Sequence, residues 1–106
     1  MTTRRKAQPG TVSHGTMRTE DLIPSFLSVA ESHRLSRADR ARVREIQATM
    51  KEHEERDTFE SYWTSEDAGY DLEALFDILE TIAPARHYFG AHPGDGADYG
   101  FWEVEQ

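Results

Sequence analysis

The residues best suited to chemistry lie near the C-terminus, in residues 92–98. His92, Asp95 and Asp98 are spaced three apart, and imidazole and carboxylate groups at that spacing could hold a divalent ion or another small ligand. The same segment is rich in Asp, Gly and Pro. Asp side chains accept hydrogen bonds from nearby backbone N–H groups and Gly allows positive φ, so a purely structural turn is the favoured interpretation. No metal is assigned to the loop.

A second group of candidate residues is acidic and falls in two expected helical segments, residues 52–60 and 66–80. Carboxylates on exposed helix faces could occupy a basic surface of a partner protein, where charge complementarity speeds association and makes it sensitive to salt. The acids expected to contact such a partner are Glu52, Glu55, Glu66, Asp67, Glu73, Asp77 and Glu80.

A third group is basic. Arg37, Arg40, Arg44 and Lys51 share one face of an expected helix, away from its apolar side, and a basic stripe of this kind could lie against phosphates. A solvated face, or one paired with the chain's own acids, is the favoured interpretation.

The distribution of charge also disfavours binding of nucleic acid by this basic face. The net charge is −8, but residues 1–18 carry +4, residues 19–33 carry −3, residues 34–51 carry +4 and residues 52–106 carry −13. Because the second half is strongly anionic, binding along a nucleic-acid backbone is disfavoured and basic partners are favoured.

Several classes of protein are excluded by motifs that the sequence lacks. It has no cysteine, so disulfides, thiolate catalysis and Cys-based zinc sites are excluded. It has no Gly-x-Ser-x-Gly, His-Glu-x-x-His, P-loop or EF-hand pattern. No apolar run is long enough to span a bilayer, and no secretory signal follows the basic N-terminus. We therefore expect a cytoplasmic, non-enzymatic protein with no cofactor.

The elements that must position these residues are three helices and a hairpin. The helices are predicted to start near Thr19, after Ser36 and after Ser65, each with a capping residue. Their expected core positions are Leu22, Ile23, Phe26, Leu27 and Ala30, then Leu35, Val43, Ile46 and Met50, then Leu72, Leu75, Phe76, Leu79, Ile82 and Ala83.

The hairpin is predicted from two aromatic runs, residues 86–91 and 99–104, joined by the loop 92–98. Gly90 and Gly100 are expected where another strand or a helix approaches closely. Residues 1–15 are expected to form a flexible arm in which only Val12 could reach the core. The predicted fold is α+β: residues 16–106 form one small domain of three helices packed on a C-terminal β-hairpin.

Two stretches, SHGTMRTEDLIP at 13–24 and YFGAHPGDGADYGFW at 88–102, resemble a family of small uncharacterised proteins of tailed phages, plasmids and their bacterial hosts. The resemblance covers about a quarter of the chain and is weak over residues 34–70. It implies a setting in mobile genetic elements and carries no activity and no residue of known role. Short acidic proteins of such elements often inhibit host machinery, including restriction and CRISPR systems, which is an association and not a mechanism.

Three functions remain open at this stage. The favoured one is a protein-binding module that presents its acidic helices to a basic, nucleic-acid-binding surface, as an anti-restriction or anti-CRISPR inhibitor or DNA mimic would. The second is a metal- or ligand-binding protein that uses His92, Asp95 and Asp98. The third is a nucleic-acid binder that uses the basic stripe and the N-terminal arm.

Overall fold

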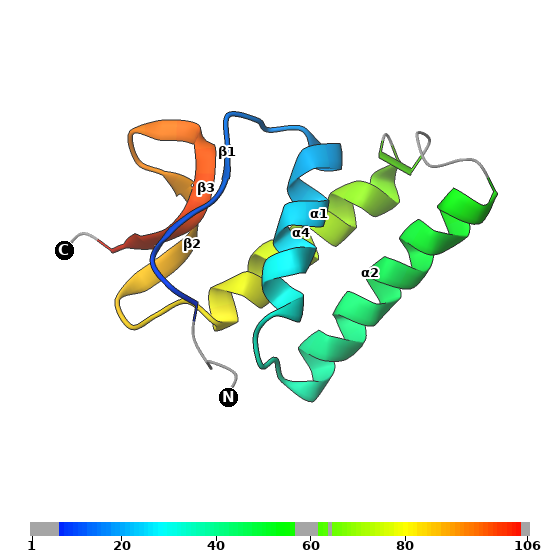
Figure 1. Ribbon diagram of the computed structural model, residues 1–106, viewed down its shortest axis with the longest axis horizontal. Helices are drawn as coiled ribbons and strands as arrows, with labels where there is room; N and C mark the ends of the chain where they lie inside the picture. The colour runs from blue at the N-terminus through cyan, green and yellow to red at the C-terminus, as the bar shows by residue number, and fades with distance from the viewer. Residues whose placement is uncertain (1–6, 57–61, 64, 105–106) are drawn as a thin grey trace.

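The computed structural model describes residues 7–56, 62–63 and 65–104. Over these residues it confirms the α+β fold class, with the three helices α1, α2 and α4 and an antiparallel sheet in one small domain. The elements follow in the order β1 (Gly10–His14), α1 (Thr19–Glu31), α2 (Arg37–Glu55), α4 (Glu66–Thr81), β2 (His87–His92) and β3 (Asp95–Glu103). The sheet forms one layer, α1 and α4 pack against it, and α2 lies beyond them (Figure 1).

The sheet has the order β1-β3-β2, so that β3 is paired on both sides. Phe89 pairs with Phe101 across the hairpin, and Gly90 pairs with Gly100. The connection is shorter than expected: β2 continues to His92 and β3 begins at Asp95. The pairing jumps from Ala91↔Tyr99 to His92↔Asp95, so most of the expected loop residues belong to an irregular start of β3.

The strand β1 corrects the expectation of a flexible arm over residues 1–15. Residues 10–14 pair with β3, from Gly10↔Phe101 to His14↔Asp98, and Val12 packs against the core. Before the strand, the N–H of Ala7 donates to the carbonyl oxygen of Ile82 at 2.8 Å. Backbone hydrogen bonds hold this part of the arm, and its polar sequence does not indicate them. Residues 1–6 lie outside the described residues.

Two of the three helix starts agree with their expected caps. Ser36 accepts a hydrogen bond from the N–H of Asp39 at 3.1 Å, and Ser65 accepts one from the N–H of Ala68 at 3.3 Å. In α1 the residue expected as the cap, Thr19, is the first helical residue. Arg18 occupies the cap position, and its side chain makes no capping hydrogen bond to a backbone N–H of the first turn.

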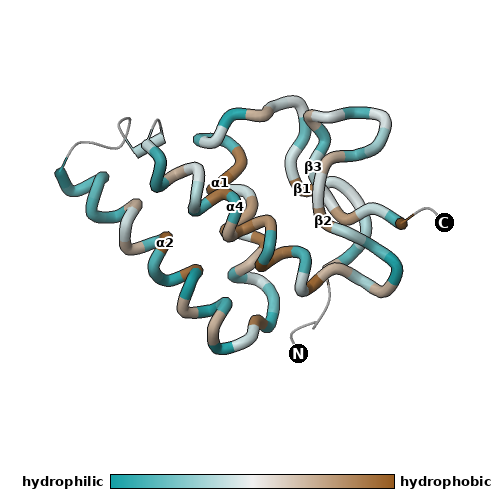
Figure 2. Tube along the Cα trace, turned by 180° about the vertical axis from the view of Figure 1, so that it is seen from behind, coloured by the Kyte–Doolittle hydropathy of each residue, from teal (hydrophilic) through white to brown (hydrophobic). Residues whose placement is uncertain are grey.

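The core is aromatic at its centre and joins the helices to the sheet. The ring of Phe26 meets those of Phe76, Phe89 and Tyr99 at centroid distances of 5.3, 4.9 and 5.9 Å, each nearer to edge-on than to stacked. Figure 2 shows apolar segments concentrated in α1 and α4, whereas α2 is largely hydrophilic. The helix that carries most of the candidate acids, α4, is therefore anchored on its inner side.

Candidate functional site

The outer side of α4 carries a row of exposed acids around one exposed aromatic residue. Successive members of the row are four, three, four and three residues apart. At 100° per residue, this places their side chains within about 80° of the helix circumference. We call them the acidic stripe: Glu66, Tyr70, Glu73, Asp77 and Glu80. Tyr70 is 65% exposed in the middle of the stripe. Asp67 is also exposed but projects about a quarter-turn away from the others.

Within the described residues, the carboxylates of the stripe form no ion pair. Among the described residues, the ion pairs join Arg18 to Glu20 and Asp21, and Arg56 to Glu52, and His14 lies 3.7 Å from Asp95; none of these contacts uses an acid of the stripe. One end is tied to the sheet, because Glu80 Oε2 accepts a hydrogen bond from the N–H of Phe89 at 2.7 Å. The stripe thus combines free negative charge with a fixed position.

The other two predicted partner-binding acids, Glu52 and Glu55, lie on α2 and so belong to a different helix. Both are exposed, and Glu52 Oε1 is paired with Arg56 at 2.9 Å. Residues 57–60 of the expected acidic segment lie outside the described part of the chain. We therefore restrict the candidate surface to α4.

One acid of α4, Asp71, has a structural role that the sequence analysis missed. Its Oδ2 accepts a hydrogen bond from the hydroxyl of the fully buried Tyr62 at 2.7 Å. Burial raises the pKa of Asp71, and the hydrogen bond from Tyr62 opposes that shift. Burial also raises the pKa of Tyr62, and the contact with Asp71 adds to the rise. This pair links Tyr62 to α4.

The residues of the expected loop site, His92, Asp95 and Asp98, do not come together as one group. His92 Nδ1 accepts a hydrogen bond from the N–H of Gly94 at 2.9 Å, and its ring stands edge-on to Trp102 at 4.7 Å. Asp95 and Asp98 come together with His14 of β1 instead, with one potential ligand atom from each within 4.8 Å of the others. His14 was missed because the sequence analysis placed it in the arm.

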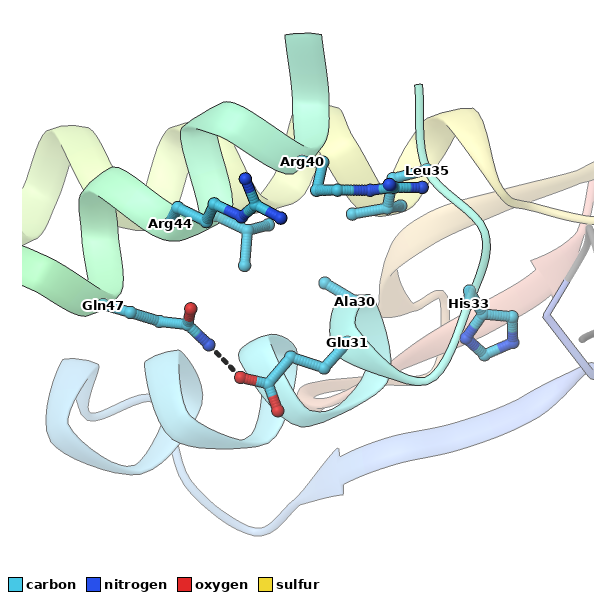
Figure 3. Close-up of a pocket in the computed structure, with 8 residues that line it drawn as sticks. Ala30, Glu31, His33, Leu35, Arg40, Arg44 and Gln47 are labelled. Carbon is cyan, nitrogen blue, oxygen red and sulfur yellow. Dashed lines mark hydrogen bonds between the residues drawn. The ribbon is translucent and has the colours of Figure 1, made fainter. Parts of the chain in front are cut away.

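The basic residues Arg37, Arg40, Arg44 and Lys51 are all exposed, as expected. Arg40 and Arg44 line a cavity of about 210 Å³ between the end of α1 and α2 (Figure 3). Glu31 and Gln47 also line it, and the side-chain amide of Gln47 donates to the carboxylate of Glu31 (Figure 3). This volume is below the roughly 300–1,000 Å³ of typical small-molecule sites, and Glu31 offsets part of the positive charge.

No family model, curated protein or solved structure matches this chain. Within the described ranges, none of the helices has both the length and the apolar character needed to cross a membrane. We therefore infer the function from the surfaces of the described residues.

Proposed function

We propose that this chain is a non-enzymatic binding module whose acidic stripe on α4 binds a basic surface of a partner protein. The observation that carries the proposal is the row of four exposed carboxylates without an ion pair among the described residues. Unpaired like charges repel each other, and a complementary basic surface relieves that repulsion while it speeds association.

The spacing of the charges favours a basic protein surface over close imitation of duplex DNA. From Glu66 to Glu80 the stripe covers about 21 Å of helix axis at 1.5 Å per residue, so its four carboxylates are on average about 7 Å apart along the axis. Duplex DNA carries about one charge per 1.7 Å and a single strand about one per 3.4 Å. A partner surface that normally holds a single strand matches this density better, which keeps an inhibitor of nucleic-acid-handling machinery within the proposal.

Tyr70 supplies the apolar contact that charge alone lacks. Tyrosine is among the residues that dominate binding energy at interface centres, because its ring buries a large area at low entropic cost and its hydroxyl remains satisfied at a wet edge. Here it stands between Glu66 and Glu73, so a partner would meet an aromatic anchor surrounded by acids.

The proposal is tested by affinity purification of the tagged chain from host cells, with mass spectrometry of the retained proteins. We expect a basic, nucleic-acid-handling protein that is retained at about 0.1 M salt and released near 1 M, where the Debye length falls from about 10 Å to about 3 Å. Nuclease treatment should not release it. Retention that depends on nucleic acid would instead favour the basic stripe on α2.

Two variants locate the contact. Tyr70→Ala should reduce recovery of the partner at least about tenfold, as expected for truncation of a hot-spot residue. Met17→Ala is the matched control, since Met17 is equally exposed at 65% and lies outside α4. Equal recovery with both variants, or no salt-sensitive partner at all, would overturn the proposal.

A further inference from the structure

We propose that His14, Asp95 and Asp98 form a divalent transition-metal site that links β1 to the start of β3. The site lies on the sheet, is built from other residues than the acidic stripe, and does not depend on partner binding. It also differs from the loop site expected from sequence, because the imidazole comes from β1 and not from His92.

The backbone brings these three side chains together from distant parts of the chain. His14 and Asp98 are direct partners in the antiparallel pairing of β1 with β3. The N–H of Gly15 donates to the carbonyl oxygen of Ala97 at 3.0 Å, which fixes the end of β1 beside the same segment. The irregular start of β3 allows Asp95 and Asp98 to approach one imidazole, although residues three apart face opposite sides of a regular strand.

The distances fit a metal with short bonds. His14 Nε2 lies 3.7 Å from Asp95 Oδ2. Two ligand atoms of a tetrahedral zinc ion, each about 2.0–2.1 Å from the metal, are separated by about 3.4 Å. A shift of a few tenths of an ångström would therefore bring these two atoms to the separation that zinc requires. With Asp98 included, the three potential ligand atoms lie within 4.8 Å of one another, a distance that side-chain rotation can shorten.

A second observation points to a cation independently of this clustering. Asp98 Oδ1 is buried and accepts no hydrogen bond within the described part of the chain. A carboxylate oxygen removed from water without a donor is costly, and a bound cation would satisfy it. By contrast, Asp95 Oδ1 already accepts from the N–H of Ala97 at 3.0 Å, which leaves its Oδ2 toward His14.

The donor set selects the class of metal. Calcium and magnesium prefer oxygen ligands alone, whereas an imidazole with two carboxylates suits Zn²⁺ and its neighbours in the first transition row. The side chains of His14 and Asp95 are 66% and 49% exposed, so the outer side of the site remains accessible to water as a further ligand. A metal ion bound at this site would cross-link β1 to the start of β3.

The test is calorimetric titration of the untagged full chain with Zn²⁺, repeated with Co²⁺, whose visible absorption reports nitrogen and oxygen coordination, and with Mg²⁺. We expect one Zn²⁺ per chain, at least tenfold weaker binding in His14→Ala and in Asp98→Asn, and no comparable binding of Mg²⁺. His92→Ala is the matched control and should bind as the unmodified chain does, because His92 lies against Trp102.

A second readout separates the site from diffuse binding to other acids. Zn²⁺ should raise the melting temperature of the unmodified chain and of His92→Ala, but not of His14→Ala. Absence of binding, binding that persists in His14→Ala, or an equal loss in His92→Ala would each overturn the proposal.

Discussion

Replacement of Tyr62 by phenylalanine removes one hydroxyl from a fully buried ring and leaves Asp71 without its donor. Hydrogen bonds to charged groups contribute about 1.5–3 kcal/mol, and partial exposure of Asp71 reduces this, so we expect a loss of about 1–2 kcal/mol. For a domain of this size the melting temperature should fall by roughly 5–10 °C. Tyr70→Phe is the matched control, because its hydroxyl lies on a side chain that is 65% exposed.

The same variant changes the titration of Asp71. The hydrogen bond from Tyr62 lowers the pKa of Asp71 while burial raises it, so Tyr62→Phe should raise that pKa further. Since the folded-state pKa lies above the ordinary value of about 3.8, the folded state binds this proton more tightly than the unfolded state does. The contribution of Asp71 to stability should therefore fall as pH rises from about 3.8 through the folded-state pKa.

The assays are chemical unfolding at several pH values and NMR titration of the Asp71 carboxyl carbon. Asp71→Asn keeps an acceptor oxygen but cannot titrate, so the stability of the unmodified chain relative to Asp71→Asn should decrease across this pH range. A Tyr62→Phe effect no larger than that of Tyr70→Phe, together with an unchanged titration midpoint, would refute the account of this pair.

Two further predictions concern the sheet and the core. In Gly100→Ala the added Cβ would stand 2.9 Å from the carbonyl carbon of Gly10 and from Thr11 Cα, so we expect a loss of about 1–3 kcal/mol in urea unfolding. Gly96→Ala meets nothing within 4 Å and should change stability by less than about 0.5 kcal/mol; equal effects would contradict the close approach of β1. Phe26→Ala should cost about 3–5 kcal/mol because three rings lose their common partner, and Phe26→Leu should cost clearly less. Similar melting temperatures for both Phe26 variants would contradict a core centred on this ring.

The helices could be predicted from sequence because their signals are local. Ser36 and Ser65 cap the helices that follow them, and the apolar residues of α4 recur at helical spacing. The strand β1 could not be predicted in this way. Its five residues contain one apolar side chain, Val12, and its stability comes from backbone pairing with a strand more than 80 residues later. Gly100 was correctly expected at a close approach, whereas an added Cβ at Gly90 would meet only the side chain of Tyr88.

The candidate sites likewise contain residues that could be predicted from sequence and residues that could not. The exposed positions of Glu66, Glu73 and Asp77 follow from the helical period, and Tyr70 could have been found from the same period. By the same period Asp71 falls about 140° from Glu66, on the side of Leu75 and Ile78, so the helical pattern places it toward the core. Its hydrogen-bond partner Tyr62 enters from outside the helix, so the pair could not be predicted from α4 alone. The meeting of His14 with Asp98 requires the register of a strand that sequence alone did not indicate.

The most direct measurement of the central claim is recovery of the partner by a charge-reversed chain. Glu73→Lys/Asp77→Lys reverses two acids of the stripe, and Glu54→Lys/Glu103→Lys makes the same change in net charge at exposed acids outside it. All three chains should melt at similar temperatures. If the stripe carries the function, the first variant loses the salt-sensitive partner and the second retains it. Equal recovery by both would contradict the account.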